Sequence, residues 1–367
     1  MSSFNIGFVK SLIFHIFPIL RKTQKINLSL GVFGLIKAQS GLMSEITRGF
    51  NTDKIYKHQL KRFFRFLSNP RIKPERLIGF WSSFCLRKFC PGREIVVALD
   101  WTTLPGNIQC LMLALPYHGR AIPLFWQMLP YWQIKDSQNR IEERLIAGFL
   151  NLLPENGNGN KKKRVILTAD RGFGRASFVQ FLLKKGVQFV LRVRAGVRIK
   201  PNNEKATLLR VLGGALKPEV PVWLPSVSYR DDGIVPEINL AAVVAKDSND
   251  PWFLVTNLKS QNKTVGTYKL RFQIEEWFKD LKHQLGINNL QTKDLKRVRR
   301  LMFVACVSYG LLMLVGNLVN RFPKVREKII TKGKQVCSRI WLALEIIKHH
   351  FCGKTFWEKV WAMGVSP

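Results

Sequence analysis

The spacing of hydrophobic and polar residues changes twice along the chain and divides it into three regions. Up to residue 92, apolar positions recur every three or four residues, which is typical of helices, in Leu28–Gln39, Met43–Phe50 and Ile55–Leu67. Short apolar runs that alternate with helical segments then predict a mixed region. From residue 301 the helical period returns. We therefore expect a basic helical N-terminal region at 1–92, an α/β core at 93–300 and a helical C-terminal region at 301–367.

The order of elements in the middle region predicts its fold. Three strands separated by short turns come first, at Arg93–Asp100, Cys110–Pro116 and Ala121–Leu129. A helix, a strand, a second helix and another strand follow, at Arg140–Leu153, Arg164–Asp170, Ala176–Lys185 and Gln188–Arg194. This is the order of a ribonuclease-H-like core with a mixed sheet. The residues at about 195–250 are rich in Val, Pro and Gly and predict a β-rich insertion, after which Trp252–Asn257 rejoins the core.

The most apolar stretch of the chain, Leu301–Val319, is long enough to cross a membrane. Polar and small residues interrupt it, among them Ser308, Tyr309 and Asn317. A single span placed this late, directly after a charged segment, would be an unusual anchor. We therefore expect a buried core helix and no membrane partner, with a membrane protein as the alternative.

Composition points to a polyanionic partner. The chain carries 59 Lys and Arg against 24 Asp and Glu, a formal net charge of +35. Such a charge attracts a polyanion, either nucleic acid or an anionic membrane, and we expect nucleic acid and a cytoplasmic, nucleoid-associated protein. Four cations crowd one predicted helix and indicate either a DNA-binding face within 1–92 or a solvated face of a packing helix: Lys57, Lys61, Arg62 and Arg65. Six Cys without a CxxC pair, and only six His, argue against a zinc site.

Two acids follow predicted buried strands. Asp100 and Asp170 each end an apolar run, where an acid costs free energy unless something compensates it. If the two strands are parallel neighbours, both carboxylates lie at the same edge of the sheet. Together with Glu275 from a later helix, they form an oxygen-only set without His or Cys, which is typical of Mg²⁺ or Mn²⁺ sites. Two such ions can hold the attacking and leaving oxygens of a phosphodiester.

The third acid lies in a segment with helical period, Tyr268–Lys282. At about 100° per residue, Glu275 shares an arc of about 60° with Tyr268, Arg271 and Lys282, whereas Glu276 lies outside it. An apolar stripe lies beside this arc. We expect Thr264 or Thr267 to cap the start of the helix, and Gly286 to cap its end. The alternative is a surface helix whose charges have these spacings by chance.

The spacing Tyr268-x2-Arg271-x3-Glu275-x6-Lys282 resembles the YREK signature of bacterial insertion-sequence transposases of the family-four group, which are DDE enzymes of the cut-and-paste type. Asp100-Trp101-Thr102, His118-Gly119-Arg120 and Ala169–Phe173 are similar to other motifs of that family, so the resemblance covers about residues 93–350. It implies Asp100, Asp170 and Glu275 as the catalytic and metal-binding residues. It also implies that Tyr268, Arg271 and Lys282 hold the DNA at the transposon end. Relatives of this kind cleave through a DNA hairpin and shelter a flipped base against a Trp of the insertion, for which Trp223 is the candidate.

The leading prediction is therefore a DNA transposase. It would cut an insertion sequence at its terminal inverted repeats and join the 3′ ends to target DNA, as a homodimer in the DNA complex. A ribonuclease-H-like nuclease without strand transfer is one alternative, because it would need the same carboxylates. A non-enzymatic basic DNA-binding protein is another, and it would not depend on a metal.

Overall fold

The computed structural model describes residues 4–50, 53–134, 137–153, 163–201, 205–214, 216–230, 234–244, 250–319, 338–349 and 354–365, with single positions between 322 and 329. The strands are β1 (Glu94–Leu104), β2 (Ile108–Tyr117), β3 (Arg120–Pro130), β4 (Arg164–Ala169), β5 (Gln188–Val193), β6 (Arg198–Lys200), β7 (Thr207–Leu208), β8 (Val222–Arg230), β9 (Ile234–Val243) and β10 (Trp252–Thr256). The helices before and within the sheet region are α1 (Ile6–Ile16), α2 (Lys22–Ala38), α3 (Met43–Arg48), α4 (Tyr56–Ser68), α5 (Pro74–Phe89), α6 (Gln138–Leu150), α7 (Ala176–Lys184) and α8 (Leu209–Gly214). The later helices are α9 (Gln261–Lys279), α10 (Leu295–Val319), α12 (Arg339–His349) and α13 (Lys354–Val365).

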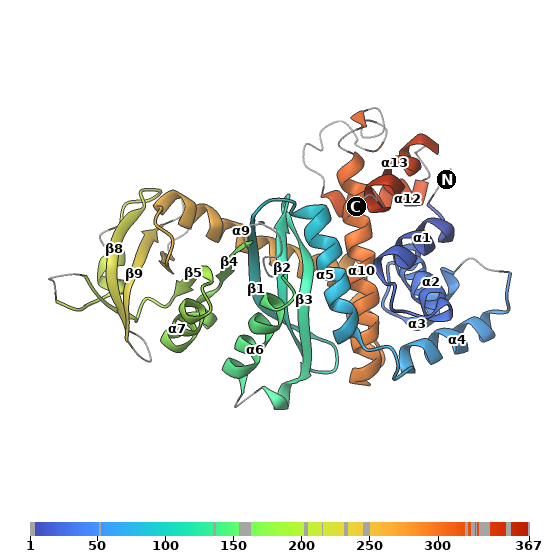
Figure 1. The fold of residues 1–367 in the computed structure, drawn as a ribbon, viewed down its shortest axis with the longest axis horizontal. Helices are drawn as coiled ribbons and strands as arrows, with labels where there is room; N and C mark the ends of the chain where they lie inside the picture. The colour runs from blue at the N-terminus through green and yellow to red at the C-terminus, as the bar shows by residue number, and fades with distance from the viewer. Residues whose placement is uncertain are drawn as a thin grey trace, which may run out of the picture.

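The sheet has ten strands in the order β3-β2-β1-β4-β5-β10-β9-β8-β6-β7. Its first five strands have the predicted ribonuclease-H-like arrangement: an antiparallel meander, with β4 parallel to β1 and β5 parallel to β4. The described strands of the predicted β insertion form no separate sheet. Its strands β9 and β8 continue the core sheet through the antiparallel pairing of β9 with β10, as the left side of Figure 1 shows.

The two faces of the sheet carry different helices. Alternate residues point to opposite faces, so Ile166, Val190 and Leu254 contact Tyr268 of α9, whereas their neighbours pack into the main core with α6 and α7. By the same alternation Asp100 and Asp170 point to the α9 face, and Trp101 points to the α6 face. This places the two aspartates beside the helix that carries the third acid.

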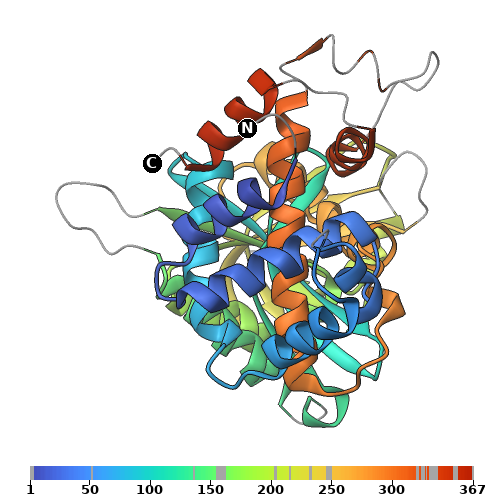
Figure 2. The ribbon, with the colours of Figure 1, turned by 90° about the vertical axis from the view of Figure 1, so that its right-hand side faces the viewer.

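The apolar helix α10 is the centre of the helical layer. Its most apolar window has a mean hydropathy of 2.0, enough to cross a membrane, but 94% of that window is buried inside the protein. It packs against α2, α4, α5, α12 and α13, and against β3 (Figures 1 and 2). The helices of the predicted N-terminal region, α1 to α5, therefore share one continuous core with the C-terminal helices. This burial supports the expected core helix.

Three local expectations need correction. The strand that carries Asp100 does not end there, because β1 continues to Leu104 along β2. The helix α9 begins earlier than expected: Ser260 is its N-cap and accepts a hydrogen bond from the Lys263 amide at 3.3 Å. Thr264 already lies within its first turn and donates to the Ser260 carbonyl at 2.8 Å.

The α-helix also ends earlier than the spacing implied. It stops at Lys279 and passes into a π-helical turn, η3 (Asp280–Gln284). Gly286 then ends the segment as predicted, with a φ of 62°. A Cβ there would lie 2.6 Å from the Gln39 carbonyl oxygen, so only glycine fits.

Candidate active site

Asp100 and Asp170 lie side by side at the edge where two parallel strands part. The last paired residues of β1 and β4 are Leu99 and Ala169, and each aspartate directly follows one of them. Asp100 is partly buried, with a side chain that is 23% exposed, and accepts a hydrogen bond from the Trp101 amide at 2.8 Å. The structure therefore brings together the two acids that the strand pattern singled out.

Arg271 joins Asp100 to the third acid. Its guanidinium lies 3.5 Å from Asp100 Oδ2 and donates a very short hydrogen bond to Glu275, four residues further along α9. The arginine side chain is only 5% exposed, whereas that of Glu275 is 43% exposed. A buried cation thus lies between two carboxylates, at the place where metal ions were expected.

Burial raises the pKa of Asp100 to about 6, although the charge of Arg271 and the hydrogen bond from the Trp101 amide lower it. Burial alone would lower the pKa of Arg271, but Tyr268, Asp170, Glu275 and Asp100 together raise it above its usual value. The guanidinium is therefore firmly charged. It compensates a group of acids that would otherwise repel one another.

Tyr268 lies in the aromatic part of this site. It is fully buried, with its ring edge-on to Trp252 at 5.0 Å, and its hydroxyl lies 3.4 Å from Asp170 Oδ1. Burial raises the pKa of the phenol to about 12, so it remains a hydrogen-bond donor at neutral pH. Tyr268 and Arg271 present little surface to solvent, and their predicted contacts with DNA remain predictions.

The donor chemistry of the site fits a hard divalent cation, because Asp100, Asp170 and Glu275 offer only carboxylate oxygens. In the described part of the chain, however, no three His, Cys, Asp or Glu residues are close enough to form a metal-binding group. The expected convergence of the three acids is therefore incomplete, since Arg271 pairs with two of them. A cation that bound all three would have to replace this guanidinium.

The two other predicted DNA contacts lie further away. Lys282 belongs to the π-helical turn η3 and is half-buried, and its ammonium makes no ion pair or hydrogen bond with a described residue. Trp223 lies on β8 opposite Ala241 and packs partly buried against the apolar cluster of Tyr268 and Trp252. Trp223 is therefore on the α9 face of the sheet. Its predicted role stays untested.

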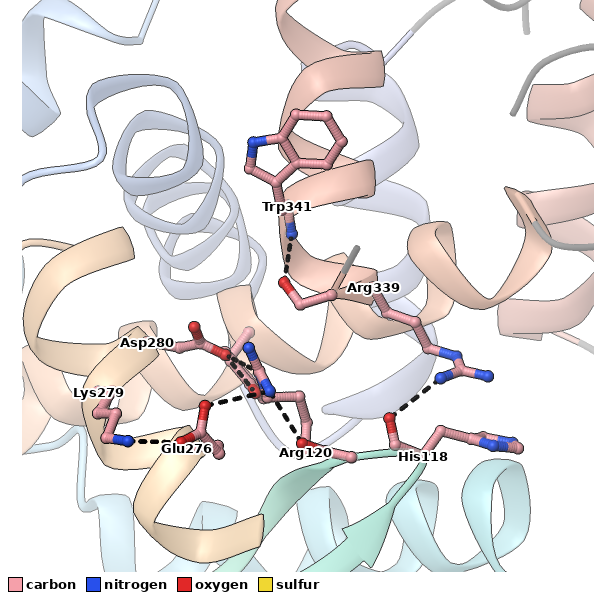
Figure 3. A network of polar contacts seen from close by, with 10 residues as sticks. His118, Arg120, Glu276, Lys279, Asp280, Arg339 and Trp341 are labelled. Atoms are coloured by element: carbon pink, nitrogen blue, oxygen red, sulfur yellow. Dashed lines mark hydrogen bonds and ion pairs between the residues drawn. The ribbon is translucent and has the colours of Figure 1, made fainter. Parts of the chain in front are cut away.

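Glu276, the residue next to Glu275, belongs to a different network (Figure 3). Its carboxylate lies 3.3 Å from Arg120 of β3 and 2.6 Å from Lys279. Arg120 also pairs with the buried Asp280 at 2.8 Å, and Asp280 accepts a hydrogen bond from Tyr309 of α10 at 3.1 Å. This network attaches the end of α9 to the meander and to the central helix.

The hairpin of the His118-Gly119-Arg120 motif takes part in the same attachment. Arg339 of α12 donates to the His118 carbonyl at 3.1 Å, as Figure 3 shows. The motif therefore connects the sheet to two segments that follow much later in the sequence.

One polar residue near the site was missed from the sequence. Glu142 of α6 is completely buried and bonds to Trp101, which directly follows Asp100, and to Arg175, which lies five residues after Asp170. The sequence did contain a signal that Glu142 is buried, because this residue precedes the buried Leu145, Ile146 and Phe149 by three, four and seven positions and so shares their helix face. An acid in the apolar stripe of a helix indicates a buried partner.

A ribonuclease-H-like sheet with two aspartates on adjoining parallel strands, and a glutamate on a helix across them, defines a class of metal-dependent enzymes that act on phosphodiester bonds. The family model described as "Transposase DDE domain" matches residues 91–311, more than half of the chain, and the chain belongs to this family. No curated protein matches the sequence. Membership makes the protein a DDE transposase that acts on DNA with divalent metal ions.

Proposed function

We propose that this DDE transposase cuts an insertion sequence at its terminal inverted repeats and joins the freed 3′ ends to target DNA. The observation that carries the proposal is the arrangement of three acids around one cation. Asp100 and Asp170 follow paired residues of parallel strands, and Arg271 connects Asp100 to Glu275. The YREK spacing supports placing the protein in the family-four group, of the cut-and-paste type.

Asp100, Asp170 and Glu275 are the residues that would hold two Mg²⁺ or Mn²⁺ ions. Such ions activate the attacking hydroxyl or water and neutralise the departing oxygen. The protein's own part is positional. The paired strands fix Asp100 and Asp170, and the rigid helix α9 fixes the direction of Glu275. Arg271 keeps the acids compensated until DNA and metal arrive, and then becomes available to a DNA phosphate.

The positive surface of α4 supports DNA binding by the N-terminal region. Lys57, Lys61 and Arg65 lie four residues apart, so they share one face of the helix, and all three are exposed. None of them forms an ion pair with a described residue. Like charges at this spacing destabilise an isolated helix by a few tenths of a kcal/mol per pair. A polyanion on this face would remove that repulsion.

Lys282 and Trp223 complete the proposed DNA contacts. The unpaired ammonium of Lys282 would hold a phosphate of the transposon end from the turn η3, and Arg271 and Tyr268 would contact the DNA from α9. Trp223 would stack against a flipped base during a hairpin step. We extend the proposal to a homodimer in the DNA complex and to a cytoplasmic, nucleoid-associated location, as the family resemblance implies.

The experiment that tests the proposal incubates the purified protein with a DNA fragment that carries the inverted repeats flanking its coding sequence, together with Mg²⁺ and a plasmid target. Cleavage at the repeats followed by joined products is expected, and Asp100→Asn should abolish both. Cleavage without joining would support a nuclease instead. Binding without metal-dependent cleavage would support a non-enzymatic DNA-binding protein.

A further inference from the structure

The fully buried Glu142 has hydrogen-bond partners on both of its carboxylate oxygens, and no step of the proposed reaction uses it. Its Oε1 accepts hydrogen bonds from Trp101 Nε1 and from Gln138 Nε2, each at 2.9 Å. Its Oε2 pairs with the guanidinium of Arg175. A buried carboxylate requires such compensation, and here two of its three partners come from distant parts of the chain.

The long-range partners of Glu142 belong to the two aspartate segments. Trp101 directly follows Asp100, and its backbone amide donates to Asp100 Oδ1 at 2.8 Å. Arg175 ends the loop that begins at Asp170, and its Nη1 donates to the Gly172 carbonyl at 2.9 Å. Within that loop the Phe173 amide donates to the Asp170 carbonyl at 2.9 Å. One carboxylate therefore connects the chain beyond Asp100 to the chain beyond Asp170.

The sheet itself does not provide this connection. The pairing of β1 with β4 stops at Leu99 and Ala169, immediately before the aspartates. Beyond this point β1 continues along β2, whereas the chain after Asp170 turns into the short helix η2 (Arg171–Phe173). No described ladder hydrogen bond joins β1 to β4 beyond that last pair. Contacts outside the β1–β4 ladder must therefore set the paths of the two chains beyond the aspartates.

We propose that Glu142 is a positioning residue that fixes the spacing and direction of the Asp100 and Asp170 carboxylates for a divalent cation, acting from the opposite face of the sheet. The inference rests on the proposed function, because it assumes that these aspartates hold metal. Glu142→Gln keeps the volume but replaces one oxygen with an NH₂ group. That group faces donors from Trp101, Gln138 or Arg175, so at least one hydrogen bond is lost.

The test measures Mn²⁺ binding to the full-length protein without DNA, from the electron paramagnetic resonance signal of the free ion, and then the Mg²⁺ dependence of cleavage. Glu142→Gln should weaken Mn²⁺ binding by up to about 10-fold, the lower end of the loss caused by removing a direct partner of a metal ligand, because Glu142 acts through Trp101 and Arg175. Excess Mg²⁺ should restore most of the cleavage rate. Glu143→Gln, on the same helix but outside the network, is the matched control and should bind Mn²⁺ like the wild type.

A Glu142→Gln protein that is folded and binds Mn²⁺ as tightly as Glu143→Gln overturns the inference. If Glu142→Gln does not fold, Trp101→Phe decides instead, because it keeps an aromatic ring at this position but removes the indole N–H that bonds to Glu142. Its Mn²⁺ affinity should fall several-fold, and an unchanged affinity would overturn the inference equally. Failure of the proposed function looks different: wild-type Mn²⁺ binding would then be unaffected by Asp100→Asn.

Discussion

Glu275 and Glu276 are consecutive residues of α9, yet their carboxylates bind different arginines on different sides of the helix. Glu275 pairs with Arg271, which also contacts Asp100, whereas Glu276 pairs with Arg120 of β3. Successive residues of an α-helix are separated by about 100°, so neither side chain can reach the other's position. The two glutamates are chemically identical, so their positions on the helix alone determine which arginine each one pairs with.

The first prediction follows from this difference. Glu275→Gln keeps the shape of the side chain but removes a metal-binding charge, so DNA cleavage should fall to the background rate while binding to transposon-end DNA persists. Glu276→Gln should retain substantial cleavage and lose at most about 1 kcal/mol of stability, because its ion pair is partly exposed. Cleavage assays with end-bearing DNA and Mg²⁺ would measure both. An inactive Glu276→Gln beside an active Glu275→Gln would refute the assignment.

Features that depend on the regular periodicity of strands and helices could be predicted from the sequence. Two apolar runs, each ending in an acid, predicted that Asp100 and Asp170 would meet at a parallel sheet edge, and the pairing of Leu99 with Ala169 brings them there. The helical period distinguished Glu275 from Glu276 for the same reason. In both cases the position of a side chain follows from local backbone geometry.

Features that depend on contacts distant in the sequence were missed. Glu142 bonds to residues 41 and 33 positions away, and Arg120 pairs with Asp280 across 160 positions. The π-helical turn was missed because tertiary contacts of Asp280 with Arg120 and Tyr309 hold it. This turn ends the α-helix at Lys279, before Lys282. The shared arc calculated from the sequence therefore holds for Tyr268, Arg271 and Glu275 but not for Lys282.

A second prediction concerns the dependence of DNA binding on salt. The net charge of +35 and the exposed cations of α4 should neutralise several phosphates, each releasing condensed counterion. We expect the logarithm of the association constant for DNA to fall with the logarithm of the salt concentration, with a slope of magnitude about 5 or more. Fluorescence anisotropy between 50 and 300 mM salt (roughly the range where such slopes are linear) would measure it. The triple variant of Lys57, Lys61 and Arg65 to Ala should lower the slope, and an unchanged slope would remove α4 from the interface.

A third prediction tests the base-sheltering role of Trp223. Stacking on an aromatic side chain is worth about 1–3 kcal/mol per base, so Trp223→Ala should slow the step that needs the flipped base by roughly 5- to 150-fold. First-strand nicking should be spared. Trp252→Ala is the control, because Trp252 packs against the same cluster around Tyr268. Equal slowing of both steps in the Trp223 variant would mean that this tryptophan only supports the fold.

A fourth prediction follows from the raised pKa of Asp100, about 6. Metal binding requires the ionised carboxylate, so the apparent Mn²⁺ affinity of the DNA-free protein should be constant well above pH 6. Below that pH it should fall by about tenfold per pH unit for each proton displaced. Isothermal titration at pH 5 and at pH 7.5 (about one unit or more on either side of the expected midpoint) would detect this. No pH dependence in this interval would contradict the assigned burial of Asp100.

The same shift affects stability without metal. Because the folded pKa lies above the unfolded value of 3.8, the contribution of Asp100 to folding is complete below about pH 4 and is lost as the pH rises through about 6. Asp100→Asn removes the titrating group. Urea titrations of the metal-free protein measure the free energy of unfolding. Between pH 4 and pH 6 the variant should lack the part of its decrease that comes from Asp100 in the wild type.

The last prediction separates Arg271 from Lys282, the two cations that the YREK spacing groups together. Arg271 is buried and compensates Asp100 and Glu275, whereas Lys282 is half-buried and pairs with no described acid. Arg271→Ala should lower the thermal midpoint of the metal-free protein, since it leaves the partly buried Asp100 without its cation, and Mg²⁺ should restore much of the lost midpoint. Lys282→Ala should leave the midpoint nearly unchanged with or without Mg²⁺.

Both variants should bind transposon-end DNA more weakly, because each removes a cation proposed to hold a phosphate. The combination of the two readouts is therefore decisive. If Arg271→Ala weakens DNA binding without a metal-dependent change in the thermal midpoint, the guanidinium does not compensate the acids in the place of a metal ion in the free protein. If instead it changes the midpoint but leaves DNA binding intact, Arg271 acts only within the site, and Lys282 alone would remain as the contact to the DNA end.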